Sequence, residues 1–119
     1  MLGEVSGDRT VRGITMRGRG GVFCAGGDVV SIVKSVEGQG RAARAFFADE
    51  YRLNHLEYTY RKPGVAFMDG ITMGGGVGLG CHAAHRIVGE TSQIAMPECA
   101  IGLLPDIGGS FLLGRANRL

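Results

Sequence analysis

The chain has 119 residues, of which 45% are hydrophobic and 20% charged, and its formal net charge is +2. This composition is ordinary for a globular protein, and the length suffices for one small domain that buries roughly two-thirds of its unfolded surface. The net charge gives no argument for nucleic-acid binding by itself, and no apolar run reaches the roughly 18 residues of a membrane-spanning helix.

The first half of the chain predicts a strand, a loop and two helices. Val11–Arg17 has the alternation of a short strand, and residues 18–27 form a glycine-rich loop. Asp28 is expected to cap a helix that continues to about Val36, because its carboxylate can accept from the first free amides. After a glycine break, apolar residues at helical spacing predict a longer helix over residues 41–60.

The second half alternates short strands with helices. Val65–Met68 is an apolar run of buried-strand length, and the glycines that follow open a helix ending near Ala84. Arg86–Val88 and Ile94–Met96 are expected to be strands, and Ile107–Leu113 a last helix. This alternation predicts an α/β fold with a mostly parallel sheet and flanking helices. Residues 1–119 are expected to form a single, partial domain, because the chain starts at its first strand and ends without a closing element.

Cysteine and histidine spacing argues against a metal site. Cys24, Cys81 and Cys99 are odd in number and include no C-x-x-C pair, which is typical of free thiols in a reducing compartment. His82 and His85 share a possible helix face but have no third ligand nearby. No metal is therefore predicted. The first residues also show no signal-peptide or clear transit-peptide pattern.

Two glycine-rich turns each stand between a strand and a helix. They are "FCAGGD" at Phe23–Asp28 and "TMGGGVGL" at Thr72–Leu79. The first amides of a helix lack internal partners and lie at the positive end of its dipole, so two converging turns would offer donors to one negative oxygen. Such an oxyanion hole requires glycine, because the ligand must touch the main chain. The alternative is that the glycines only permit tight turns.

Glu98 and Asp106 are the acidic candidates. Each follows a proline and stands among apolar residues, so desolvation would raise its pKa towards a working range for acid–base chemistry. The alternatives are a plain surface turn at Glu98 and a helix cap at Asp106.

Taken together, "FCAGGD", the glycine triplet and "MPE…IGLLPDIGG" resemble the crotonase (enoyl-CoA hydratase/isomerase) superfamily in order and approximate spacing. The resemblance covers about Val11 to Arg115 and is strongest to the 3-hydroxyisobutyryl-CoA hydrolase branch. It implies a partial crotonase-like ββα spiral core. Family members are considerably longer, which implies that this chain is a fragment, a shortened product, or a part completed by other chains.

The resemblance also implies a site. The amides of Gly27 and Gly75 would bind a thioester carbonyl, with Glu98 and Asp106 as the catalytic acids. Hydratases of the superfamily carry a glutamate three residues after the second oxyanion glycine, and that position here is Gly78. The remaining site residues implied by the resemblance are Ala25, Gly26, Asp28 and Gly74.

The function implied is hydrolysis of a short branched 3-hydroxyacyl-CoA, as in valine breakdown. Coenzyme A would be part of the substrate, with no separate cofactor, and Arg17 or Arg19 would contact its phosphates. The alternative for these arginines is a solvated strand edge.

The other functions considered are an enoyl-CoA hydratase or isomerase, and a non-catalytic subunit of a large assembly such as a mitochondrial ribosome. Expected partners are the acyl-CoA and either further copies of this chain or other chains that complete the fold, with no membrane, and nucleic acid only within a ribosome-like assembly. The implied location is the mitochondrial matrix in a eukaryote and otherwise the cytoplasm.

Overall fold

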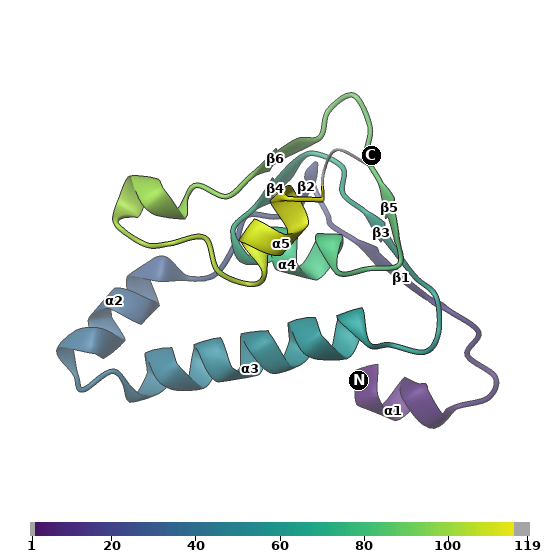
Figure 1. Ribbon diagram of the computed structural model, residues 1–119, viewed down its shortest axis with the longest axis horizontal. Helices are drawn as coiled ribbons and strands as arrows, with labels where there is room; N and C mark the ends of the chain where they lie inside the picture. The colour runs from purple at the N-terminus through teal and green to yellow at the C-terminus, as the bar shows by residue number, and fades with distance from the viewer. Residues whose placement is uncertain (1, 116–119) are drawn as a thin grey trace.

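The computed structural model describes residues 2–115 and contains two three-stranded parallel sheets (Figure 1). One sheet has the order β1-β3-β5 and the other β2-β4-β6. The strands are β1 (Ile14–Arg17), β2 (Val22–Cys24), β3 (Gly64–Phe67), β4 (Ile71–Met73), β5 (His85–Ile87) and β6 (Gln93–Ala95). The helices are α1 (Leu2–Gly7), α2 (Val29–Glu37), α3 (Arg41–Tyr58), α4 (Gly75–Cys81), the 3₁₀ helix η1 (Glu98–Ile101) and α5 (Gly109–Leu113). None of the described helices is long and apolar enough to cross a membrane.

The chain winds as a spiral in which each turn gives one strand to each sheet. Gly64 of β3 pairs with Ile14 of β1, and Val65 pairs with His85 of β5. In the other sheet Ile71 of β4 pairs with Val22 of β2 and with Gln93 of β6. The mixed α/β class with parallel strands and flanking helices is therefore confirmed.

Most predicted elements are confirmed within a few residues, but four elements were missed, namely α1, β2, β4 and η1. The strands β2 and β4 have three residues each, lie beside glycines and show no clear alternation, so their sequence carries little strand signal. They form because each finds a parallel partner in the spiral. The helix α1 precedes β1, the strand predicted to be the first element of the fold.

The two candidate helix caps have different outcomes. Asp28 caps α2 as expected, because its Oδ1 accepts from the backbone N–H of Ser31 at 3.0 Å. The helix cap considered as the alternative role of Asp106 is wrong, since α5 begins at Gly109 and its N-cap residue is Gly108, with φ of 78°. The Asp106 side chain caps no helix and instead accepts a hydrogen bond from α3.

The core lies between the sheets and α4. Met68 and Ala66 are fully buried, and Met16, Phe23 and Cys81 pack against them. The helix α4 approaches β2 so closely that a Cβ placed on Gly76 would lie 2.2 Å from the Cys24 carbonyl oxygen, where no side chain fits. The glycines of α4 are thus required by packing as well as by the turn that precedes them.

The helix α3 runs along one side of the molecule, with α2 beside one end and α1 beside the other (Figure 1). Just after the C-terminal end of α3, Lys62 Nζ donates to the carbonyl oxygens of Val5 and Asp8, and the Tyr60 hydroxyl donates to the carbonyl oxygen of Leu2. These bonds fix α1 against the chain that leaves α3.

Glu57 lies near this junction, and both of its carboxylate oxygens are buried without a hydrogen-bond partner among the described residues. Desolvation raises its pKa from an ordinary 4.5 to about 7. The folded state therefore holds this proton more tightly than the unfolded chain does. Stability from this group is complete below about pH 4.5 and is lost as the pH rises to about 7.

We predict that Glu57→Gln removes this dependence. Relative to the variant, the unmodified chain should lose about 1–2 kcal/mol of unfolding free energy across that pH interval, a value reduced for partial solvent exposure. Urea unfolding at several pH values measures it, with exposed Glu90→Gln as the control. Parallel stability curves for the unmodified chain and Glu57→Gln would contradict the assignment.

Candidate functional site

The two glycine-rich turns meet through their backbones. A Cβ placed on Gly75 would lie 3.7 Å from the backbone nitrogen of Gly27, and one on Gly26 would lie 3.7 Å from the nitrogen of Gly75. Gly26 and Gly74 have φ of 103° and 52°, the left-handed region that favours glycine. The turn before α2 and the turn at the start of α4 therefore present main chain to the same space.

This space is part of a pocket of about 330 Å³. One wall consists of the two turns, another of α3 and a third of the segment from Pro97 to Asp106. The volume is at the lower end of the range of small-molecule sites. Its described lining includes Ala25, Gly26, Gly27, Val29, Ile32, Phe46, Phe47, Glu50, Tyr51, Gly74, Gly75, Pro97, Glu98, Ile101, Leu103, Leu104 and Asp106.

Glu98 reaches the second turn from the start of η1. A Cβ placed on Gly74 would lie 3.0 Å from Glu98 Oε1, so this carboxylate touches the turn that opens α4. Its Oε2 is buried and has no hydrogen-bond partner among the described residues. The alternative of a plain surface turn is therefore wrong for this side chain, which is directed inward. A buried carboxylate oxygen without a protein partner, beside a turn of bare glycines, is an arrangement suited to a ligand.

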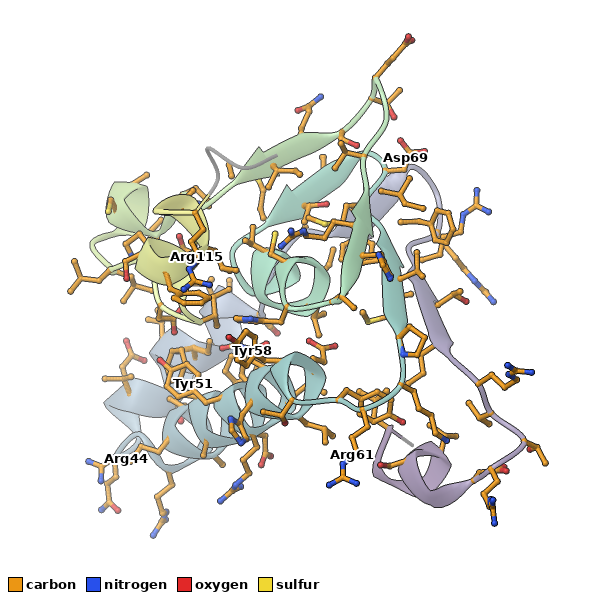
Figure 2. All side chains as sticks on the ribbon, turned by 45° about the vertical axis from the view of Figure 1, so that its right-hand side comes forward. Arg44, Tyr51, Tyr58, Arg61, Asp69 and Arg115 are labelled. Carbon is orange, nitrogen blue, oxygen red and sulfur yellow. The ribbon has the colours of Figure 1, made fainter. Side chains whose placement is uncertain are left out.

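Asp106 reaches the pocket from the loop between η1 and α5. Its Oδ2 accepts a hydrogen bond from the Tyr51 hydroxyl on α3 at 2.8 Å. Desolvation, followed by this bond to Asp106, raises the pKa of Tyr51 to about 12, so the phenol stays a neutral donor. Figure 2 shows Tyr51 and Tyr58 on α3, between that helix and α5.

Glu50 is a pocket carboxylate that sequence reasoning missed. Its Oε1 would lie 2.5 Å from a Cβ on Gly75, so it stands directly over the second glycine turn. Desolvation raises its pKa, and the negative charges of Asp106 and Glu98 add to the effect. A charged residue on an amphipathic helix normally indicates a solvated face, and nothing in the local pattern separates Glu50 from its neighbours.

The other predicted site residues divide between the pocket and the surface. Ala25, Gly26 and Gly74 line the pocket beside Gly27 and Gly75, whereas Asp28 does not line it and serves as the cap of α2. Arg17 and Arg19 are exposed and lie outside the lining. Within residues 2–115, no group of three or more His, Cys, Asp or Glu side chains is placed to hold a metal ion. The chemical roles of the site residues remain predictions.

Comparison with known proteins identifies the class. The sequence model of the enoyl-CoA hydratase/isomerase family matches residues 1–119, so the chain belongs to that family. The crystal structure of a carnitinyl-CoA dehydratase from Mycobacterium thermoresistibile superposes on this chain with a TM-score of 0.93 at 50% sequence identity. The superposition covers 97% of this chain and 34% of the dehydratase chain. The crotonase-type fold is thereby confirmed.

Two curated relatives make the likeness more particular. The chain is 50% identical over 103 residues to a mitochondrial 3-hydroxyisobutyryl-CoA hydrolase of Xenopus tropicalis. This match covers 86% of this chain and 27% of the hydrolase. It is 52% identical over 106 residues to the small ribosomal subunit protein mS47 of Neurospora crassa, covering 86% of this chain and 21% of that protein. The chain thus spans about a quarter of the length of these relatives.

Because Glu50 shares the pocket with two other carboxylates, we predict that Glu50→Gln stabilises the fold at neutral pH. Removing one charge relieves desolvation and repulsion, and the gain should be about 0.5 kcal/mol because the pocket is open to solvent. Because the pKa of Glu50 is raised in the folded state, its charge destabilises the fold only at a pH above the ordinary carboxyl range. The stability gained by Glu50→Gln should therefore disappear in acid, where Glu50 is protonated. Chemical denaturation with Glu90→Gln in parallel measures it, and an equal gain in both variants would refute the repulsion.

Proposed function

We propose that this chain carries the thioester-binding and catalytic centre of an acyl-CoA hydrolase of the 3-hydroxyisobutyryl-CoA type. The observation that supports the proposal best is the meeting of two bare glycine turns with an inward carboxylate, Glu98, in one pocket. Membership of the family and the likeness to named hydrolases support the substrate class. Coenzyme A enters as part of the substrate, and the proposal needs no separate cofactor.

In this mechanism the N–H groups of Gly27 and Gly75 donate to the thioester carbonyl oxygen. That oxygen gains negative charge as a nucleophile adds to the carbonyl carbon, so two fixed donors stabilise the transition state more than the ground state. Losing one such donor lowers the rate by about 100–1000-fold in comparable sites. The absence of side chains on both turns is what permits this close approach.

Glu98 takes one of two roles. As a general base it removes a proton from water, which attacks the carbonyl and expels the coenzyme A thiolate. As a nucleophile it attacks the carbonyl itself, forms a mixed anhydride as the thiolate leaves, and is regenerated when water opens the anhydride. Either route yields a carboxylic acid and free coenzyme A, whose thiolate takes up the proton. Asp106 would orient the substrate hydroxyl or assist this proton transfer.

The enzymatic alternative is a hydratase or isomerase, which the likeness to a dehydratase structure favours. The position that carries a glutamate in hydratases is Gly78 here. Gly78 is buried in α4, and a Cβ there would lie 2.9 Å from Ile107 Cδ1, so a glutamate at this position would have to displace the Ile107 side chain. The comparison assay adds crotonyl-CoA and a 3-hydroxyacyl-CoA separately. Loss of the enoyl absorbance would indicate hydration, and release of free thiol indicates hydrolysis.

A second candidate function is a structural part of a mitochondrial ribosome, favoured by the likeness to mS47. Copurification with RNA and a size-exclusion mass far above that of the chain would support this role. A mitochondrial location for the chain in a eukaryote rests on the names of these relatives.

We predict that Glu98→Gln lowers thioester hydrolysis by at least about 100-fold, because the amide can neither remove a proton nor attack. Release of free thiol from 3-hydroxyisobutyryl-CoA measures the effect. The control is Glu90→Gln, which changes the same functional group at an exposed turn. Unchanged turnover in the Glu98 variant would remove this residue from the mechanism.

A further inference from the structure

We propose that Tyr51 is a positioning residue for Asp106, an inference that rests on the proposed hydrolase site. The Tyr51 hydroxyl donates to Asp106 Oδ2 at 2.8 Å across a sequence separation of 55 residues. It is the one hydrogen bond that the described residues make to the Asp106 side chain. Tyr51 would therefore hold this carboxylate in place without touching the reacting atoms.

The two partners differ in how firmly their backbones are held. Tyr51 belongs to α3, a helix of 18 residues, and its ring packs against Phe47 with centroids 6.3 Å apart. Asp106 lies in an irregular segment, flanked by Gly102 and Gly108 with φ of 77° and 78°. A loop residue gains more order from a bond to a helix than a helix residue gains from a bond to a loop.

Electrostatics makes this restraint necessary. Desolvation raises the pKa of Glu50 and the charges of Asp106 and Glu98 add to the effect, so Glu50 and Asp106 repel each other across the pocket. Nothing else in the described residues offsets the charge of Asp106 by a hydrogen bond to its side chain. The Tyr51 phenol, with its pKa raised to about 12, remains a donor at neutral pH and opposes this repulsion.

The pair also stands between two cavities. Tyr51 and Asp106 line both the glycine-turn pocket and a neighbouring pocket of about 630 Å³ that contains Tyr58 and His82. The bond between Tyr51 and Asp106 therefore fixes the shared wall. With Oδ2 engaged by the phenol, Oδ1 is the oxygen of Asp106 left for the substrate.

The test is Tyr51→Phe, which keeps the ring and removes the donor. Tyr58→Phe is the matched control, because Tyr58 lies seven residues further along α3, packs its ring against His82 and Phe111, and makes no hydroxyl hydrogen bond among the described residues. We expect Tyr51→Phe to lower kcat about 10-fold or more, the loss of a hydrogen bond to a charged group, with KM within about twofold. Tyr58→Phe should change neither constant. A Tyr51 variant with kcat at the original level would overturn the proposal.

A second readout does not depend on turnover. In protein labelled with ¹³C at the aspartate carboxyl carbon, the resonance that disappears in Asp106→Asn reports the Asp106 environment. We expect Tyr51→Phe to move this resonance by more than its line width at neutral pH, and Tyr58→Phe to leave it in place. An unmoved resonance would refute the contact.

The two readouts separate the possible failures. Absence of hydrolysis by the unmodified chain would count against the proposed function, while the resonance would still decide whether Tyr51 holds Asp106. Because Tyr51 is 48% exposed, Tyr51→Phe should fold normally, and an unchanged amide spectrum of the remaining residues verifies this.

Discussion

The structure depends on one close approach between main chains. At the start of α4 the backbone of Gly76 lies so near the Cys24 carbonyl oxygen that a Cβ would be 2.2 Å away. This contact joins α4 to β2 and thereby brings the turn that follows β2 beside the turn that follows β4. Packing and ligand access thus make the same demand on the glycine triplet, because a side chain on it would separate the two turns or fill the space between them.

Negative charge is concentrated where the main chain is bare. Glu50 and Glu98 approach the second glycine turn from α3 and η1, and Asp106 adds a third carboxylate from the neighbouring loop. The charges of Asp106 and Glu98 add to the desolvation that raises the pKa of Glu50, and such a crowding of like charges costs stability, as is typical of functional sites. The amides of the glycine turns and the Tyr51 phenol are the complementary groups, since each supplies a donor where the carboxylates supply acceptors.

Sequence could predict the parts of this chain that have strong local signals. Glycine clusters marked both turns, and Asp28 marked the start of α2. The strands β2 and β4 could not be predicted, because three-residue strands are stabilised by their partners. Glu50 and Tyr51 were missed for a similar reason. Their importance arises from contacts with residues about 25 and 55 positions away, which the periodicity of one helix does not reveal.

The spiral has turns of very unequal length. Ile14 pairs with Gly64 across the whole of α2 and α3, whereas Val65 pairs with His85 across little more than α4. The segment that carries Glu50 and Tyr51, α2 with α3, is therefore a long insertion between β2 and β3, and it joins the two sheets at its ends. Such an insertion can change in length or composition while strand pairing stays in register. Within this architecture, the α2–α3 side of the pocket can change separately from the two glycine turns that form its other wall.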